Sequence, residues 1–516
     1  MSATLSLPLH HPARFNAGWF VAPIVAVLAF AGATPAIATA PLDHAIVVEA
    51  SSVRAASAAV TRLGGHVDTA LGVVGGVAAH VDDVAFKTLM NDTAVRVTPD
   101  IVLHATSDNF SIAGSTADSQ MSAMAPGPAW SLAAGQGVGV ALIDTGVNPT
   151  PDLRGDRLVR GPDFSGEGDG VDRFGHGTFM AGLIAGDGTA SSSGGTRHVG
   201  TAPGATVVSV KVAGADGSTS LSRLIGGIGW AIAHEDDYSI GVMNLSFGAD
   251  VNLPYLANPL SGAVEAAWAS GITVVTSAGN TATNVTSPGD DPFVLTVGST
   301  DTTAAMSIGD GTVAPFSGRE QFPRYSKPDL LAPGVSVVSL RAVGSTIDVG
   351  HPSARVGSVY FRGSGTSMST ALVSGAAAVM LDGHPNATPD DVKGALLDGG
   401  VAVNGSTAPA ISLAGADLAT PTSDWWQHYP LAFGGLGRGL TAMPWTASRW
   451  TASRWTASRW TASRWTGSRW TASRWTASRW TASRWTDSDW NDASWTASRW
   501  TASRWTDASW NALGWG

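Results

Sequence analysis

The chain of 516 residues contains no cysteine, which excludes disulfide bonds and any metal site built on thiolates. Charged residues are also scarce, at 14%, and with 44% hydrophobic residues and 62 glycines this composition argues against a coiled coil or a wholly disordered chain. Beyond the first 40 residues, no apolar run approaches the roughly 20 residues that a membrane-spanning helix needs. The length and composition instead predict a globular α/β protein with more than one segment.

Residues 1–38 have the pattern of a secretory signal peptide. Arg14 precedes an apolar stretch over about 19–33, and Ala36-Ile37-Ala38 supplies the small residues of a cleavage site. An uncleaved membrane anchor is the alternative, but a stretch of about 15 apolar residues interrupted by Pro23 is short for a span. We therefore expect a secreted or cell-envelope-associated protein. Without disulfides, its stability depends on core size, a high unfolding barrier or bound ions.

Residues 43–105 have the pattern of a small α+β domain. A strand-like run is followed by an Ala-rich helical stretch at 52–63, two strand-like runs, a second helical stretch at 82–90 and a last strand-like run, VRVTPDIVLH. This is the order of a split βαββαβ unit, although another kind of small α+β adaptor would give the same pattern. The polar, small residues of 106–125 predict an exposed linker, where processing would fall.

Between residues 126 and 421, strand-like runs such as GVGVALID, VVSVKV and ITVVTSAGN alternate with helix-like runs. This alternation predicts βα units that form a mainly parallel sheet with helices on both faces. In such folds the functional groups lie at the carboxyl ends of the strands.

Four short motifs in this region carry groups suited to acyl transfer. Asp144 ends the strand-like run VALID, His176 and Ser367 each open a helix, and Asn280 ends the run VVTSAGN. A hydroxyl is a poor nucleophile at neutral pH unless a base takes its proton, and a histidine, with an ordinary pKa near 6.5, suits that role. Asp144 would orient the imidazole, and Asn280 with the Ser367 N–H would donate to the oxyanion. Each motif alone is also explained by a turn, a loop or a helix cap. Together, in this order, they predict a catalytic set.

Over about 300 residues, these motifs and their order resemble the subtilisin family of serine proteases. Residues 211–218 resemble the family's substrate-flanking edge, 244–248 its opposing substrate strand, and 327–334 a segment that precedes the serine motif. The resemblance implies a subtilisin-like α/β fold, an inhibitory pro-domain at 43–105 and an acyl-enzyme formed on Ser367. It also implies that a polypeptide substrate adds as a strand between the 216–219 edge and the 245–248 strand.

The helix after Ser367 departs from the family pattern. The family usually reads Gly-Thr-Ser-Met-Ala, then Ser or Thr, then Pro-His-Val, whereas this chain has Ser369-Thr370-Ala371-Leu372-Val373. The missing Pro and His lie behind the nucleophile and take no part in bond breaking. The departure therefore concerns helix packing more than activity.

The same resemblance assigns a set of substrate-binding residues: Gly217, Ser218, Leu245, Ser246, Phe247, Gly248, Ala278 and Gly279. Three of them, Gly248, Ala278 and Gly279, are small and have no evident carboxylate beside them, which predicts an open, mainly apolar primary pocket and a broad or hydrophobic preference. The chemistry requires no cofactor. Family members commonly bind structural calcium, and the 163–172 loop carries carboxylates, although solvated surface aspartates explain that loop better.

After a linker at 422–444, residues 445–516 form a tail in which Trp recurs every five residues, mostly as Trp-Thr-Ala-Ser-Arg. Ten arginines and four aspartates give the tail a charge of +6. Residues spaced by five do not line one face of a helix, and on a strand they alternate between its two faces. The tail therefore forms a solenoid of short β segments with four pentads per coil, or else a flexible, sticky arm. Exposed Trp and Arg suit carbohydrate or cell-wall polymers, a passive spacer is the alternative, and an exported address argues against nucleic acid.

The sequence as a whole predicts a secreted serine endopeptidase whose pro-domain acts as an intramolecular inhibitor. Two other hypotheses compete with it. A catalytically dead fold could serve as a binding protein, but the complete set Asp144, His176, Ser367 and Asn280 argues against that. A structural surface protein acting through its Trp tail would leave these four motifs unexplained.

Overall fold

The computed structural model describes residues 44–105, 134–191, 197–249, 253–303 and 307–414, the single residues 42, 305 and 432, and the backbone of short strands between 445 and 507. The predicted signal peptide at 1–38 and linker at 106–125 lie outside the described residues, and so does the 422–444 linker except Ala432. No helix within the described ranges is both long and apolar enough to cross a membrane.

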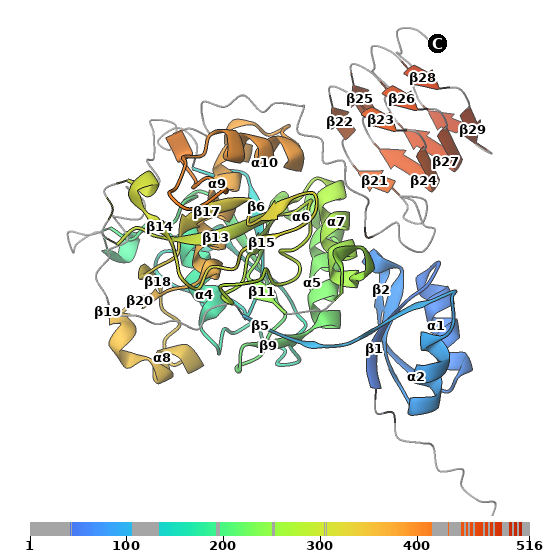
Figure 1. The fold of residues 1–516 in the computed structure, drawn as a ribbon, viewed down its shortest axis with the longest axis horizontal. Helices are drawn as coiled ribbons and strands as arrows, with labels where there is room; N and C mark the ends of the chain where they lie inside the picture. Colours follow the sequence, from blue (N-terminus) through green and yellow to red (C-terminus); the bar gives the residue numbers. More distant parts are fainter. Residues whose placement is uncertain are drawn as a thin grey trace, which may run out of the picture. The chain divides into compact units, whose positions relative to one another are not determined.

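The N-terminal α+β domain has an antiparallel sheet of four strands in the order β2-β3-β1-β4, drawn in blue in Figure 1. Its helices begin at capping side chains, since Ser52 accepts the N–H of Ala55 and Asp82 accepts that of Ala85. Its elements are β1 His44–Glu49, α1 Val53–Arg62, β2 His66–Leu71, the 3₁₀ turn η1 Gly72–Val74, β3 Gly76–Val81, α2 Asp83–Met90 and β4 Arg96–Pro99.

The last strand predicted for this domain is in fact two strands. β4 pairs with β1, whereas β5 (Val102–Ala105) leaves the domain and pairs with β9 and β11. Pro99 has no N–H to continue the ladder, and the Asp100 carboxylate turns away to accept the N–H and hydroxyl of Ser222, at 2.8 and 2.7 Å. The chain therefore changes sheets at residues 99–101.

The central sheet has the order β14-β13-β12-β10-β6-β8-β7, and β17 also pairs with β13. All these pairs are parallel except that of β14 with β13. The strands are β6 Gly139–Asp144, β7 Leu158–Asp163, β8 Thr206–Lys211, β10 Ile240–Leu245, β12 Thr273–Ser277, β13 Leu295–Asp301, β14 Thr312–Val313 and β17 Leu330–Pro333. The chain passes from β6 toward β7 and β8 on one side and later to β10 on the other, so the order reverses beside β6, where such sheets bind ligands.

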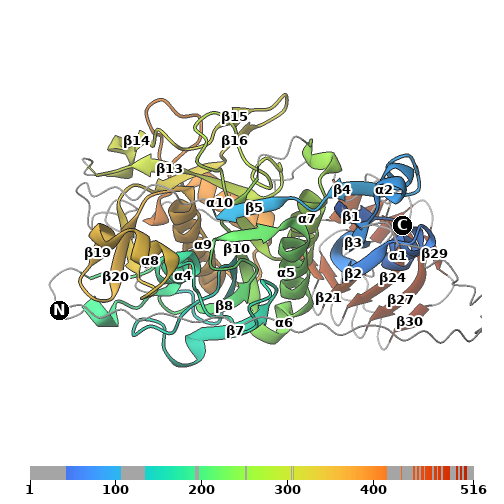
Figure 2. The ribbon, with the colours of Figure 1, turned by 90° about the horizontal axis from the view of Figure 1, so that it is seen from below.

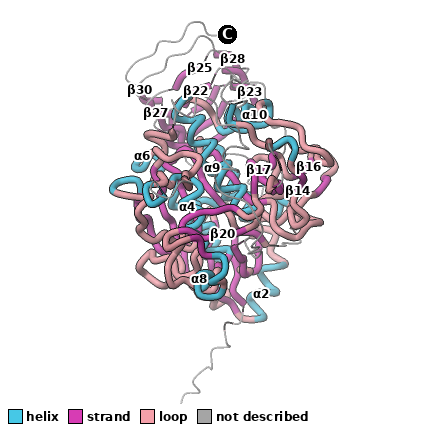
Figure 3. The backbone as a smooth tube through the Cα atoms, turned by 90° about the vertical axis from the view of Figure 1, so that its left-hand side faces the viewer, coloured by secondary structure: helices cyan, strands magenta, loops and turns pink. Residues whose placement is uncertain are grey.

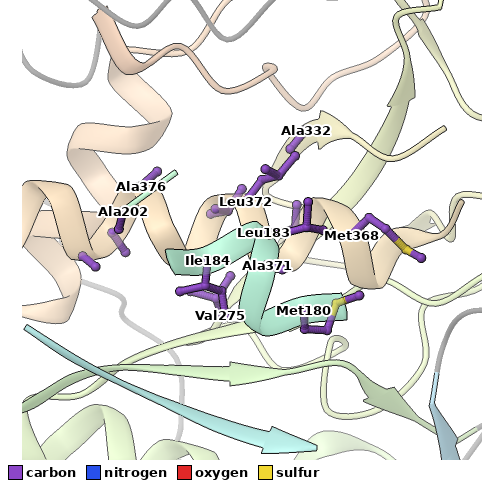
Figure 4. Close-up of a cluster of buried hydrophobic side chains, with 14 of the residues drawn as sticks. Met180, Leu183, Ile184, Ala202, Val275, Ala332, Met368, Ala371, Leu372 and Ala376 are labelled. Atoms are coloured by element: carbon purple, nitrogen blue, oxygen red, sulfur yellow. The ribbon is translucent and has the colours of Figure 1, made fainter. Parts of the chain in front are cut away.

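Helices cover both faces of this sheet, as Figure 2 shows. α4 (His176–Ala185) and α9 (Thr366–Gly383) pack on one face, and α5 (Leu221–Ala233) and α7 (Pro259–Ser270) on the other. Alternate β6 residues face the two layers, with Leu142 in the first core and Ile143 in the second. Figure 4 shows Met180 and Ile184 of α4 close to Ala371 of α9, and Figure 3 shows both helices in cyan near the middle of the view. The predicted α/β class, with a mainly parallel sheet, is confirmed.

Shorter elements surround this core. The helices are α6 Glu235–Tyr238, α8 Thr346–Gly350 and α10 Pro389–Asp398, and the 3₁₀ turns are η3 Gly155–Arg157, η4 Thr189–Ser191, η5 Tyr255–Ala257, η6 Ile308–Asp310 and η7 Pro352–Ala354. The strands are β9 Ser218–Ser220, β11 Phe247–Gly248, β15 Glu320–Gln321, β16 Ser326–Lys327, β18 Val337–Leu340, β19 Arg355–Val356 and β20 Tyr360–Gly363.

The tail strands pair in parallel with partners 20 residues along the chain, so that Trp445 lies opposite Trp465 and Trp460 opposite Trp480. This spacing corresponds to coils of four pentads. The strands are β21 Trp445–Ala447, β22 Trp450–Ala452, β23 Trp455–Ala457, β24 Trp460–Gly467, β25 Trp470–Ala472, β26 Trp475–Ala477, β27 Trp480–Asp487, β28 Trp495–Ala497, β29 Trp500–Ala502 and β30 Trp505–Asp507.

Candidate active site

Asp144 and His176 form a buried couple at the carboxyl end of the central sheet. Asp144 is the last residue of β6, and His176 is the first of α4. The Nδ1 of His176 lies 2.8 and 2.9 Å from the two carboxylate oxygens, and each side chain is 1% exposed. A carboxylate on Nδ1 stabilises the tautomer that carries its proton there, which leaves Nε2 as an acceptor. Within the described ranges, Nε2 is buried without a hydrogen-bond partner.

A second buried carboxylate, Asp172, fixes the loops around this couple. It accepts the Thr145 hydroxyl at 2.8 Å and the N–H groups of Gly175 and Thr178 at 2.6 and 2.8 Å. Thr145 in turn donates its N–H to Asp144 and accepts the N–H of Gly177, at 2.7 and 2.9 Å. Burial raises the pKa of Asp172, while these hydrogen bonds oppose that rise. This network could not be predicted from the sequence, because no local pattern relates Thr145 to Asp172, 27 residues later.

Ser367 is the second residue of α9 and is fully buried. Asn280, three residues after β12, lies beside the same helix start, since its Oδ1 accepts the N–H and the hydroxyl of Thr366, both at 3.0 Å. These two donors identify the atom facing Thr366 as the amide oxygen, so the NH₂ group is the donor that Asn280 can offer elsewhere. The structure thus brings Asn280 next to Ser367, as the sequence predicts, while its role in stabilising an oxyanion stays a prediction.

The chain's own segment β5 lies as a strand between the two edges predicted to hold a substrate. Figure 1 shows β11, β5 and β9 in that order. His104 pairs antiparallel with Gly248 on one side and with Ser218 on the other, and Ala105 pairs with Phe247. Ala105 also donates its N–H to the Gly217 carbonyl at 3.2 Å. An extended polypeptide therefore fits between these two edges by β-augmentation, antiparallel to both.

Comparison with known proteins agrees with this geometry. The model of the Subtilase family matches residues 135–409, more than half of the chain. The chain belongs to the subtilase family. The serine protease AprX of Bacillus subtilis (strain 168) is 44% identical over 276 residues, which cover 51% of this chain and 61% of AprX. Subtilisin BL of Lederbergia lenta is 32% identical over 289 residues, which cover 55% of this chain and 91% of that protein.

The crystal structure of fervidolysin from Fervidobacterium pennivorans, a keratinolytic enzyme, matches with a TM-score of 0.58 and 23% identity, covering 73% of this chain and 61% of that one. This likeness concerns the fold alone. The family and the more similar relatives identify the subtilase domain as that of a serine endopeptidase. The chain spans about three fifths of the length of AprX.

The predicted substrate-binding residues of the subtilase domain do not all lie at the cleft. Phe247 and Gly248 form β11, and the Phe247 ring lies 6.4 Å from that of His176 between centroids. Ser246, between β10 and β11, is buried and accepts the Asn244 amide. Leu245 lies in the central sheet: its backbone pairs with β6 and β12, and its side chain lies in the core. Its part in substrate binding stays a prediction.

The walls predicted for the primary pocket of the subtilase domain are tied together by backbone hydrogen bonds. Ala249, next to Gly248, forms a bridge with Ser287, and the Ala278 carbonyl accepts the N–H of Thr286. Gly279 has a φ of +87°, and a Cβ there would lie 2.6 Å from the Thr286 hydroxyl. Both the backbone conformation and the close approach require glycine at this position.

The carboxylates of the acidic loop at 163–172 pair with cationic side chains and N–H groups of the protein itself. Glu167 pairs with Lys211 and Arg173, and Asp169 pairs with Arg173. Asp163 accepts N–H groups from its own loop. Burial alone would raise the pKa of Asp163, but these hydrogen bonds and the positive charge of Lys211 outweigh burial and lower it. In the described ranges, no group of three or more acidic or histidine side chains could hold a metal ion. Structural calcium stays a prediction.

The helix that departs from the family pattern is continuous in this subtilase domain. α9 runs from Thr366 to Gly383 without interruption. Ser369 bonds the Ser299 hydroxyl at 2.9 Å and the Ala332 carbonyl at 3.0 Å, while Ala371 and Leu372 lie in the core. Ala371 and Leu372 therefore pack this helix in place of the usual Pro and His, and Ser369 stands where the family usually has Ala.

Proposed function

We propose that this protein is a secreted serine endopeptidase that cleaves peptide bonds through an acyl-enzyme on Ser367. The observation that carries the proposal is the buried Asp144–His176 couple, whose Nε2 is the acceptor, at the same sheet edge as a cleft that binds an extended strand. Burial strengthens the attraction between the Asp144 carboxylate and the imidazolium that forms during attack, which offsets the cost of placing that charge away from water.

In the proposed mechanism, His176 Nε2 takes the Ser367 hydroxyl proton as the oxygen attacks the substrate carbonyl, and later gives that proton to the leaving amine. Asp144 stabilises the imidazolium that exists between these steps. The Asn280 NH₂ group and the Ser367 N–H donate to the oxyanion. Water then releases the acyl group by the same route in reverse.

We propose that residues 43–105 are an intramolecular inhibitor of the enzyme. Support comes from β5, which fills the cleft as a substrate would, and from Val73 and Val74 of η1, which pack in one core with Leu224 and Val264 of α5 and α7. Because the strand enters the cleft at Val102 and pairs up to Ala105, the maturing cut falls in the 106–125 linker, close to its start.

We propose further that the tail attaches the enzyme to cell-wall or polysaccharide polymers. Its regular Trp spacing, its charge of +6 and its pairing at a 20-residue interval support a repetitive, adhesive surface. The preference of the cleft is proposed to be broad or hydrophobic, because Gly248, Ala278 and Gly279 leave it lined by small residues.

Labelling with a fluorophosphonate probe tests the enzyme proposal directly. The purified, processed protein should react, and mass mapping should place the label on Ser367, with labelling lost after heat denaturation or in His176→Ala. A folded protein that neither labels nor hydrolyses casein would contradict the proposal and favour a catalytically dead binding protein.

A further inference from the structure

Helix α8 lies against the turn from which the candidate base begins. The N–H of Thr346, its first residue, donates to the Arg173 carbonyl at 2.8 Å, and the N–H of Ile347 donates to the Phe174 carbonyl at 3.0 Å. Residues 173–175 lead directly into His176, the first residue of α4. Two backbone hydrogen bonds from α8 therefore hold the turn that places the imidazole.

The same residue of α8 also reaches the substrate edge. The Thr346 hydroxyl lies 2.7 Å from the Ala215 carbonyl and 3.3 Å from the Arg173 carbonyl, so its single proton is better placed for Ala215. The N–H of Ala215 donates to Glu167 at 3.0 Å, so Ala215 is held through both its carbonyl and its N–H. Two residues later, the Gly217 carbonyl accepts the N–H of the strand in the cleft. Thr346 thus bonds both to the turn before His176 and to the edge that pairs with a substrate.

The turn before His176 and the substrate edge pack closely against each other, and the turn also packs against the start of α8. A Cβ on Gly217 would lie 2.5 Å from the Phe174 ring, and a Cβ on Gly175 would lie 2.5 Å from the Ser345 hydroxyl. Both glycines have positive φ angles, +75° and +109°. The turn, the edge and the start of α8 therefore touch at positions where no side chain fits.

α8 is itself fixed by an ion-pair cluster around the buried carboxylate of Asp348. The Asp348 carboxylate bonds the Nε of Arg341 and of Arg355 at 2.6 and 2.7 Å, and accepts the Gly344 N–H at 2.8 Å. Burial opposes ionisation of Asp348, but these bonds outweigh it and lower the pKa to about 2. Arg355 belongs to β19, next to β20, and Figures 2 and 3 show α8 beside β20. Such a cluster keeps its charge, and so holds α8 in place, at any pH above about 3.

We infer that Thr346 is a positioning residue that sets the substrate edge and the turn before His176 relative to each other, with Asp348 as its anchor. The inference rests on the proposed function and deepens it. The Thr346 hydroxyl positions the edge and so strengthens binding of the part of the substrate that pairs with it. The Thr346 N–H acts on the placement of the imidazole.

Two thiobenzyl esters with the same final residue separate these effects. Because the proposed cut falls in the linker after Ala105, the final residue of each ester lies beyond the position of Ala105. A blocked tetrapeptide ester then extends back over the positions of residues 103–105 and pairs with the edge, whereas a blocked single-residue ester does not reach it. Thr346→Val removes only the hydroxyl, and Thr346→Ser retains both groups. Thr346→Pro removes the N–H as well. Proline is tolerated at the first position of a helix, and Ser345 already has φ −67° and ψ 164°, but the proline Cδ takes the place of the N–H that faces the Arg173 carbonyl, so the turn must shift.

We expect Thr346→Val to raise KM for the tetrapeptide ester by about 2- to 5-fold and to leave the single-residue ester unchanged, as suits one exposed hydrogen bond. Thr346→Pro should add a fall in kcat of about 3- to 10-fold for both esters. Thr346→Ser should match the wild type. Thermal unfolding of each variant shows that it is folded, and the Val and Ser pair decides the matter even if the Pro variant does not fold.

A Thr346→Val protein that behaves like Thr346→Ser, or that loses activity equally on both esters, would overturn the inference. So would a folded Thr346→Pro protein with unchanged kcat. If the processed wild type hydrolyses neither ester, it is the proposed function that fails. Val349→Ser, on the solvent side of the same helix at a residue that is 66% exposed, is the matched control and should change neither parameter.

Discussion

Asp100 provides the sharpest test of the proposed inhibitor, because it lies between the sheet of the N-terminal domain and the strand in the cleft. Its two carboxylate oxygens accept the N–H and the hydroxyl of Ser222 at the start of α5, at 2.8 and 2.7 Å. Asp100→Ala removes both bonds. The backbone bonds on either side remain, from the Asp100 N–H to Ala45 and from the Leu221 N–H to Ile101.

The size of the effect follows from these two bonds. Hydrogen bonds to a charged group contribute about 1.5–3 kcal/mol each when they are buried. Asp100 is half-buried, so we take a lower total of about 2–3 kcal/mol for the pair. That free energy corresponds to about a 30- to 150-fold weaker complex between the cleaved N-terminal domain and the enzyme.

Dilution of the freshly processed protein measures this affinity. Peptide hydrolysis is followed at early times over a range of protein concentrations, and it should appear as the inhibitory domain dissociates. The protein concentration at which half of the inhibitory domain has dissociated should be about 30 to 150 times higher for Asp100→Ala. Lys87→Ala, on the exposed surface of α2 with a side chain that is 73% exposed, is the control and should not shift it. A shift below twofold, or an equal shift in the control, would refute the reasoning.

Other predictions concern chemistry, stability and location. Ser367→Ala should abolish hydrolysis and accumulate uncut precursor; a wild-type N-terminus by sequencing would mean that another protease makes the cut. Asn280→Ala should lower kcat about 10²- to 10³-fold with little change in KM, a range already known from subtilisin rather than obtained from this structure. Burial and the neighbouring Asp291 raise the pKa of Asp290 to about 7. The folded state then binds more protons than the unfolded state between about pH 4 and 7, and stability falls as pH rises through that window. Asp290→Asn should therefore stabilise the protein by roughly 2–4 kcal/mol at pH 8 and little at pH 4, measured by calorimetry. Truncation after Pro421 should leave peptide hydrolysis nearly unchanged but abolish pull-down on insoluble polysaccharide; equal binding of both forms would mean that the tail is structural.

The sequence could predict the sheet and the positions of the polar motifs because both depend on local pattern. Asp144 directly follows a fully apolar run, and Asn280 comes three residues after the buried run TVVTS, so each was predicted to lie at the end of a buried strand. Parallel strands share their carboxyl edge, which brings residues far apart in the chain together. His176 and Ser367 begin helices after glycine-rich turns, and the structure places both at those positions.

The remainder depends on contacts between distant segments, which local pattern does not show. Thr145 and Asp172 meet through a buried hydrogen bond, and Thr346 reaches Ala215 across 131 residues, but each is an ordinary polar residue in its own surroundings. The change of sheet after β4 did leave a signal, because Pro99 cannot continue a ladder and an Asp follows it. The boundary between the central sheet and the cleft is also hard to place from sequence, because only Ser246 separates the end of β10 at Leu245 from the start of β11 at Phe247.

The tail shows how a period alone can restrict architecture. Residues five apart turn by about 500° on a helix and alternate faces on a strand, so identical residues align only if several pentads close a coil. Pairing at an interval of 20 does this, and it places Arg464 opposite Arg484 but also Asp487 opposite Asp507. Eight of the ten arginines lie between 449 and 484, and all four aspartates lie between 487 and 507. The positive charge of the tail is therefore concentrated in residues 449–484, and the proposed binding of an anionic polymer should depend mainly on them.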